Sequence, residues 1–332
     1  MKPFIVKILL FSAVSTIVLA GCSSSTSGSA SKSSSTPAGT NAKKKLKVVT
    51  TFYPMYEFSK QVAGGHADVI ALVPAGAEPH DWEPTAKDMT QIQDSDVFVY
   101  NGAGVEHWVE KALNSLHKDS SIVVEASKGI ELMEGTAEED EDVHEHGEDE
   151  KASIKPGMVM DPHVWLDPVL AQQEVLAIQA AFEKADPAHK EDYKHNATEY
   201  ISKLQELDQL FRNTLADVKR KEFVTQHAAF AYLAKRYGLT QVPIAGLSPE
   251  EEPAASKMAD IVQFAKDHQV QTIFFETLVD PKVAETVASE IGAKSAVLNP
   301  IEGLTDEDKK QNLDYIGIMK MNLNALKLAL NE

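Results

Sequence analysis

The fold of this chain is limited most strongly by an alternation of short apolar runs with helix-forming stretches, which occurs twice along the sequence. Strands that alternate with helices predict a parallel α/β sheet. Between the two alternating regions, residues 189–218 carry one apolar stripe at helical spacing. A helix of that length would extend roughly 45 Å, which suits a strut between two lobes. We therefore expect an α/β fold with two similar parallel-sheet lobes, at 46–187 and 220–332, joined by one long rigid helix over 188–219.

The expected strands are the short, mostly apolar runs. They cover 47–51, 69–73, 97–100, 122–124, 223–225, 272–275 and 296–298. The expected helices cover 54–62, 105–116, 169–182, 228–237 and 311–330, with further helix starts near Thr85 and Pro281. Asp88 follows Thr85 at the spacing of a capping box. Ligands of open α/β sheets bind beyond the carboxyl ends of strands, so these ends are the expected place for a site.

The N-terminus has the order of an export signal. Lys2 and Lys7 precede the apolar run 8–19, and small residues follow up to Cys22. This order predicts a secretory signal peptide over 1–21. The peptide Leu-Ala-Gly-Cys resembles a bacterial lipobox, which implies that Cys22 is lipidated. The mature chain is then expected to be anchored in the cell membrane, on its extracytoplasmic side.

Composition narrows the remaining choices. Cys22 is the only cysteine, so the chain has neither an intramolecular disulfide nor a cysteine metal site. The formal net charge of −18, without a basic patch, argues against a nucleic-acid partner. The Ser-rich residues 22–45 are expected to form a flexible tether. The acidic segment 134–155 cannot bury a core and is expected to be a surface insertion of the first lobe.

Two short peptides share the pattern acid-Pro-His-x-Trp. They span 78–82 and 161–165, and their histidines are His80 and His163. Proline fixes its own φ and favours extended backbone at the residue before it, so each His lies on a stiffened loop. Two histidines presented in the same way, far apart in sequence, suggest convergence on one metal ion.

Two further candidates follow predicted strands of the second lobe. His227 comes after the run 223–225, and Glu302 comes after 296–298 beside a proline. With His80 and His163, they make four expected strand-end positions, two from each lobe. Imidazole and carboxylate ligands suit zinc, and three His with one carboxylate form the expected four-ligand set in a chain without other cysteines.

The neighbours of the two N-terminal histidines have simpler interpretations. Trp82 and Trp165 are expected to be packing walls rather than ligands. The carboxylates of Glu78, Asp161 and Asp167 either orient the imidazoles as hydrogen-bond acceptors or have no part in the site.

Taken together, these motifs resemble the zinc-binding lipoproteins of bacterial ABC uptake transporters, over essentially all of residues 46–332. The shared features are the lipobox, the Ser-rich spacer, the two Pro-His peptides, the long helix and Gln-His before a helix. The resemblance implies two lobes joined by a rigid helix, with a metal ion clamped between them. It also implies that His80, His163 and His227 bind that metal.

The fourth ligand is less constrained by the resemblance. A Pro-x-Glu-Gly segment of the family points to Glu302, while Asp280, Glu276 or a water molecule are alternatives. Manganese-binding relatives tend to have Glu in place of His227 and Asp as the last ligand. His227 therefore favours zinc over manganese.

The acidic insertion also has two interpretations. His144 and His146 lie among the carboxylates of 138–150. In the family, such a loop between the first two ligand segments is often rich in His and acidic residues, and it would hold zinc weakly and raise its local concentration. Alternatively, the loop is only solvated.

The resulting expectation is a monomeric zinc receptor, not an enzyme. It would pass Zn²⁺ to an ABC permease with a separate cytoplasmic ATPase, since the mature chain has neither a Walker motif nor an apolar 20-mer. The alternatives are a manganese receptor of the same family, a secreted zinc hydrolase, and an adhesin with structural zinc.

Overall fold

The computed structural model describes residues 45–115, 121–135, 159–250 and 253–332. The signal peptide, Cys22, His144 and His146 lie outside these residues. Among the described residues, no helix combines the length and apolar character needed to cross a membrane.

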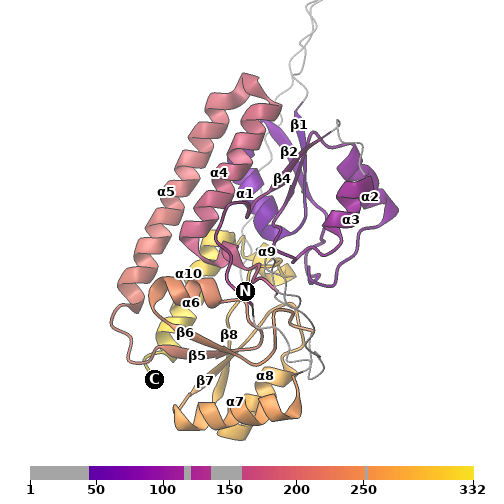
Figure 1. Cartoon of the computed structure of the whole chain (residues 1–332). Helices are drawn as coiled ribbons and strands as arrows, with labels where there is room; N and C mark the ends of the chain where they lie inside the picture. Colours follow the sequence, from indigo (N-terminus) through magenta and orange to yellow (C-terminus); the bar gives the residue numbers. More distant parts are fainter. Residues whose placement is uncertain (1–44, 116–120, 136–158, 251–252) are drawn as a thin grey trace, which may run out of the picture. The chain divides into compact units, whose positions relative to one another are not determined.

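The first lobe is built on a four-stranded parallel sheet in the order β2-β1-β3-β4 (Figure 1). Its strands are β1 (Leu46–Thr50), β2 (Ala67–Ala71), β3 (Val97–Tyr100) and β4 (Ile122–Glu125). Its helices are α1 (Tyr53–Ala63), α2 (Ala86–Gln93), α3 (Val109–Ser115) and α4 (Pro168–Ala185). The predicted strands are confirmed within about two residues, but α3 begins four residues later than expected. The predicted capping box is present at the start of α2, where Thr85 and Asp88 bond each other's backbone N–H.

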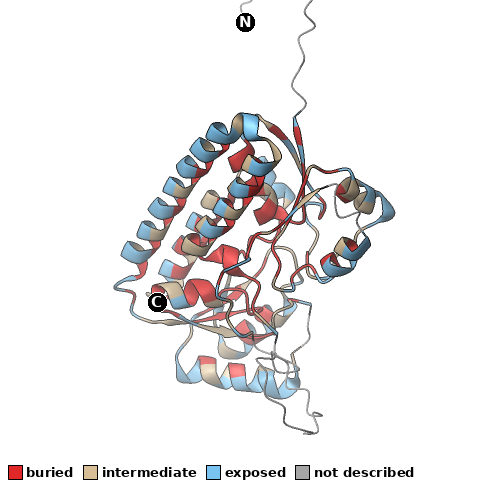
Figure 2. Cartoon of the chain, turned by 45° about the horizontal axis from the view of Figure 1, so that its top comes forward, coloured by how far each residue is buried: buried red, intermediate tan, exposed pale blue. Residues whose placement is uncertain are grey.

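The long helix α5 (Lys190–Leu215) is confirmed, with 26 residues. It is shorter than expected mainly because it ends at Leu215 rather than near 218; its start at Lys190 directly follows a separate 3₁₀ turn, η2 (Pro187–His189). Its buried stripe includes Tyr200, Leu204 and Phe211. The helix packs against α1 and α4 of the first lobe and against two helices of the second lobe, α6 (Ala231–Tyr237) and α10 (Tyr315–Ala329). Figure 2 shows its exposed outer side and its buried side toward α4.

The second lobe repeats the strand order of the first, as β6-β5-β7-β8, again with all pairs parallel. Its strands are β5 (Glu222–Thr225), β6 (Thr240–Pro243), β7 (Thr272–Phe275) and β8 (Lys294–Val297). Besides α6 and α10, its helices are α7 (Ala255–Asp267), α8 (Lys282–Ile291) and α9 (Asp306–Lys310). The sequence did not predict β6, α7 and α9. The edge strand β6 is only partly buried, so it lacks a continuous apolar run.

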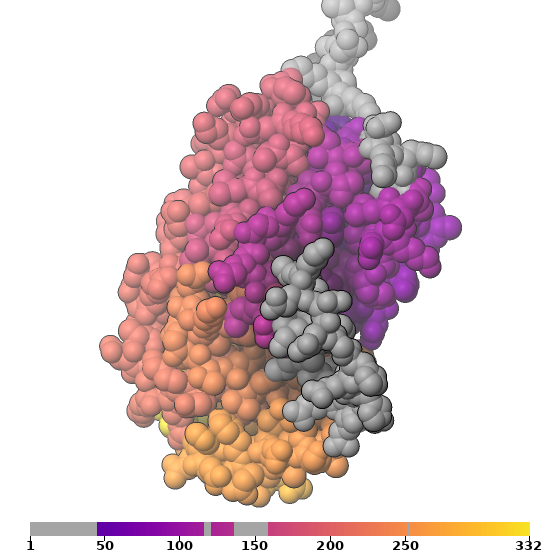
Figure 3. Space-filling view, in the orientation of Figure 1, coloured from indigo at the N-terminus to yellow at the C-terminus, as the bar shows by residue number. Residues whose placement is uncertain are grey.

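One apolar cluster runs through both lobes. It extends from β1 and α1 through α4 and α5 to β5 and α10. Trp165 contributes to this shared core as a fully buried ring, 5.0 Å from Phe52 of the first lobe. In the space-filling view, the first lobe (indigo to magenta) meets the second (orange) directly (Figure 3). Separating the lobes would expose part of this apolar surface to water. Each Å² exposed would cost about 25 cal/mol of free energy.

Candidate metal centre

His80 lies on the loop between β2 and α2, and its side chain is 10% exposed. The loop is folded locally, since the Asp81 N–H donates to Oε2 of Glu78 at 3.2 Å. Glu78 thus contacts backbone in this loop, and no bond from it to the His80 ring is found in the described structure. Trp82 packs on Trp108 with ring centroids 5.4 Å apart, which confirms its expected role as a packing wall.

His163 does not follow a strand of the sheet, which corrects the expected strand-end position. β4 ends at Glu125, and the only pairing just before His163 is an isolated antiparallel bridge between Glu134 and Met160. A carboxylate holds the residue instead: Oδ1 of Asp161 accepts from the His163 backbone N–H at 2.9 Å and lies 2.8 Å from Nδ1 of the ring. Asp161 therefore orients this imidazole and leaves Nε2 free to face inward.

His227 lies two residues beyond β5 and is fully buried. Oε1 of Glu276 accepts from its backbone N–H at 3.1 Å and lies 2.5 Å from its Nδ1. Its carbonyl accepts from the side chains of Thr225 and Gln241, both at 2.8 Å. Glu276 was considered as a fourth ligand, but it faces Nδ1 of the ring and orients His227 in the same way that Asp161 orients His163.

Glu302 follows β8 and reaches the three histidines from the second lobe. Its Oε1 lies 3.4 Å from Nε2 of His80, 3.4 Å from Nε2 of His163 and 3.6 Å from Nε2 of His227. The Nε2 atoms of His163 and His227 are 3.3 Å apart. In the described part of the chain, these four residues form the one group of three or more His, Cys, Asp or Glu side chains that could hold a metal.

The spacing of these four atoms fits a tetrahedral zinc ion. Zinc bonds of about 2.0–2.1 Å to nitrogen or oxygen place tetrahedral ligand atoms about 3.3–3.4 Å apart. The three distances from Oε1 of Glu302 and the His163–His227 distance, 3.3–3.6 Å, are close to that edge, and all four ligand atoms lie within 4.8 Å of one another. Nε2 of His80 and Oε1 of Glu302 are also buried without a hydrogen bond of normal geometry in the described structure. Buried polar atoms are seldom left in this state, so both atoms are suited to a bound cation.

The carboxylate of Glu302 and the neighbouring imidazoles shift each other's pKa values. Burial alone would raise the pKa of Glu302, but the facing imidazoles of His163, His227 and His80 outweigh burial and hold this pKa well below its ordinary value. Burial alone would lower the pKa of His227, but the carboxylates of Glu276 and Glu302 raise it to about 10. A cation would therefore meet an ionised carboxylate and would compete with a proton on an imidazole.

The pKa values of His163 and His80 shift in opposite directions. At His163, burial acts to lower the pKa, but Asp161 and Glu302 raise it. At His80, burial dominates and lowers the pKa in spite of Glu302. His80 has no carboxylate at Nδ1 comparable to Asp161 or Glu276 among the described contacts, which explains the difference.

Two other carboxylates lie away from the cluster. Asp280, an alternative fourth ligand, is exposed and forms an ion pair with Lys282 at 2.6 Å. Asp167 caps α4 through the Val169 N–H and pairs with Arg236 at 2.7 Å, so it does not orient an imidazole.

The sequence did not predict the cross-lobe bonds that hold the His163 segment. Tyr232 of α6 donates to the carbonyl of Asp161 at 2.8 Å, and Tyr315 of α10 donates to that of Trp165 at 2.5 Å. The indole N–H of Trp165 donates to the carbonyl of Pro300 at 2.8 Å. Trp165 is thus a packing wall, as expected, and it also fastens the His163 segment to the Glu302 segment. No local motif marks the two tyrosines in the sequence.

Comparison with known proteins agrees with this geometry. Residues 48–329 match the family described as ZnuA, the periplasmic component A of the zinc-uptake complex. The chain belongs to this family. A relative, the high-affinity zinc uptake system protein ZnuA of Bacillus subtilis, is 52% identical over 312 residues, which cover 94% of this chain and 93% of the relative.

Solved structures of family members share the fold. The Zn(II)-bound ZnuA-like domain of Streptococcus pneumoniae AdcA is 43% identical with a TM-score of 0.73, and the match covers 87% of this chain and 100% of that domain. Full-length AdcA is longer, and the matched region spans 55% of it. The laminin-binding protein Lmb of Streptococcus agalactiae, described as an adhesin with metal-transporting activity, is 36% identical with a TM-score of 0.74; the match covers 86% of this chain and 100% of Lmb.

Proposed function

We propose that this protein captures Zn²⁺ outside the cytoplasmic membrane and passes it to a separate ABC permease. The observation that carries the proposal is the convergence of three imidazoles and one carboxylate, whose ligand atoms all lie within 4.8 Å of one another. His80, His163, His227 and Glu302 are the proposed ligands. The family assignment and the zinc-bound relatives support the choice of metal.

The donor set argues against the alternatives of manganese and hydrolysis. Three imidazoles suit zinc, whereas manganese prefers carboxylate, carbonyl and water ligands. A catalytic zinc ion keeps one position open for water. Here Glu302 occupies the fourth position, so the proposed site is closed and has no place for an activated water.

Anchoring and partners follow from the N-terminal sequence and the family. Cys22 is the proposed lipid attachment site, and residues 22–45 are the tether to a lobe at 46–187. The long helix 188–219 then leads to a second lobe at 220–332. The protein is proposed to act as a monomer, with permease and ATPase as separate chains.

Growth in a zinc chelator tests the function. Cells that lack this protein should stop growing at a chelator concentration that wild-type cells tolerate, and added zinc should restore growth. The wild-type gene should complement the defect, and a His163→Ala variant should not. If the deletion strain grew as well as wild type and differed only in adhesion, the adhesin alternative would replace the transport proposal.

The acidic insertion is proposed to collect zinc through His144 and His146 without forming the tight site. Deleting residues 138–150 should therefore leave the dissociation constant of the tight site unchanged within about twofold. Additional weak zinc binding should disappear, as measured by titration at micromolar to millimolar zinc. Loss of the tight site in this deletion would contradict the proposed ligand set.

A further inference from the structure

Glu302 is preceded by a costly backbone conformation. Ile301 has φ of 62°, in the left-handed region, and its side chain is fully buried. A β-branched residue adopts this conformation only where its surroundings impose it. The direction in which Glu302 leaves the chain therefore depends on whatever fixes the backbone at 299–301.

Two hydrogen bonds fix this turn. Oδ1 of Asn299 accepts from the Ile301 N–H at 2.7 Å, which closes an Asx turn around Pro300. On the other side, the carbonyl of Pro300 accepts from the indole N–H of Trp165. The first of these bonds requires that Asn299 itself be held in place.

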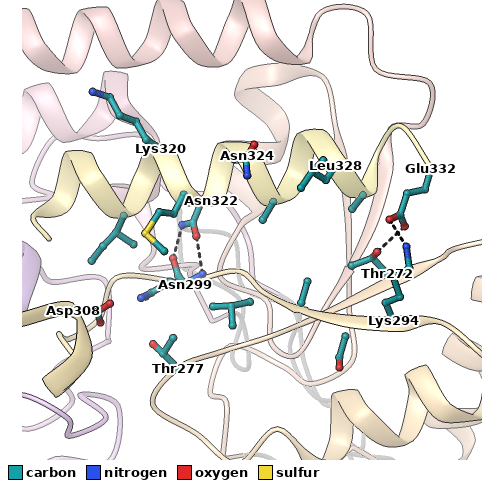
Figure 4. Close-up of a pocket in the computed structure, with 17 residues that line it drawn as sticks. Thr272, Thr277, Lys294, Asn299, Asp308, Lys320, Asn322, Asn324, Leu328 and Glu332 are labelled. Carbon is teal, nitrogen blue, oxygen red and sulfur yellow. Dashed lines mark hydrogen bonds and ion pairs between the residues drawn. The ribbon is translucent and has the colours of Figure 1, made fainter. Parts of the chain in front are cut away.

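Asn322 of α10 holds Asn299 by both of its backbone groups. Oδ1 of Asn322 accepts from the Asn299 N–H at 2.9 Å, and its Nδ2 donates to the Asn299 carbonyl at 2.6 Å (Figure 4). Both side chains are at least 95% buried. Asn299 lies two residues beyond β8, and the amide of Asn322 thus gives its backbone the pair of hydrogen bonds that a neighbouring strand would give.

We infer that Asn322 is a positioning residue for the metal ligand Glu302, an inference that rests on the proposed zinc site. The connection runs from Asn322 to the backbone of Asn299, from there through the Asx turn to Ile301, and so to Glu302. The amide supplies the acceptor and the donor that Asn299 needs on two adjacent atoms, Oδ1 and Nδ2. Aspartate lacks the donor and would set a carboxylate against a carbonyl, and leucine lacks both groups at a similar size.

The test compares zinc affinity in variants of the mature chain. Asn322→Leu and Asn322→Asp should weaken zinc binding by about 10- to 100-fold, the usual effect of losing a group that orients a ligand. Asn299→Ala, which removes the acceptor of the Asx turn, should have an effect of the same kind. Asn324→Leu is the matched control, because Asn324 is exposed on the same helix. It should bind zinc as the wild type does.

Cobalt spectra and melting separate positioning from general destabilisation. The visible spectrum of bound Co²⁺ should change in the Asn322 variants in the same way as in Glu302→Ala, since both lose the carboxylate from the metal. The melting temperature of the metal-free protein identifies any variant that does not fold. The zinc affinity and Co²⁺ spectrum of the folded variants among Asn322→Asp and Asn299→Ala then decide whether Asn322 positions Glu302. Wild-type affinity and an unchanged Co²⁺ spectrum in the folded variants would overturn the inference, provided that Glu302→Ala is affected. If Glu302→Ala itself leaves both unchanged, the proposed ligand set fails and the inference fails with it.

Discussion

Replacing His227 with alanine is expected to weaken zinc binding by at least about 100-fold. Four-ligand zinc sites bind with about 10–16 kcal/mol of apparent free energy at pH 7, so an equal share per ligand is about 2.5–4 kcal/mol. Each 1.4 kcal/mol is about tenfold in affinity, which gives roughly 10²- to 10³-fold. The loss is measured by titration against a chromophoric chelator of known zinc affinity.

The matched control for this prediction is His195→Ala. His195 is exposed on α5 and pairs with Glu199 one helical turn away, so its removal should leave zinc affinity unchanged. Metal-free melting of both variants shows whether the fold survives. A His227→Ala protein that keeps wild-type stoichiometry and affinity would exclude His227 from the site.

Zinc binding is expected to weaken about tenfold for each unit that the pH falls below neutral. The pKa of His227 is raised to about 10, so its ring carries a proton at pH 7 in the metal-free protein. The Nε2 atoms of His163 and His227 lie only 3.3 Å apart, so they cannot both hold a proton between them. Zinc needs the unprotonated nitrogen, so loading should release about one proton per ion.

The direction of this pH dependence follows from the raised pKa of His227. A fall in pH supplies the competing proton, whereas a rise in pH removes it, and the affinity should stop increasing only as the pH approaches about 10. Calorimetry in buffers of different protonation enthalpy measures the number of protons released. Glu276→Gln removes a carboxylate that raises the pKa of His227, so this variant should release fewer protons at pH 7. Binding enthalpies that do not depend on the buffer would contradict the prediction.

Much of the fold could be predicted from local sequence patterns. Buried central strands such as β3 and β7 are short apolar runs, and the capping box of α2 is a local pair, so both were predicted. The edge strand β6 was missed because it is only partly buried and lacks a continuous apolar run. The short helix α9 was missed although it begins with a local capping box of Thr305 and Asp308. The long helix was predicted from its apolar stripe, but its N-terminal limit depends on the 3₁₀ turn at 187–189.

The residues of the site also fall into those that local patterns predicted and those that only the structure could place. His80 and His163 were found because proline and tryptophan mark their loops, and His227 because it follows a strand. The choice among Glu302, Glu276 and Asp280 could not be made from spacing, since all three carboxylates follow strands of the second lobe. In the structure, Glu302 faces the three Nε2 atoms, Glu276 faces Nδ1 of His227, and Asp280 pairs with Lys282 at the surface.

The sequence by itself pointed to the class of fold, the three imidazoles and the preference for zinc, because these depend on residue type and local periodicity. Only the tertiary structure decided which carboxylate completes the cluster and which ones orient its histidines. It also revealed the shared core and the bonds by which Tyr232, Tyr315 and Asn322 hold the ligand segments. Those features depend on distances of a few ångströms between residues that are 23 to 150 positions apart in the chain. Such distances are set by packing within and between the two lobes and have no local signature in the sequence.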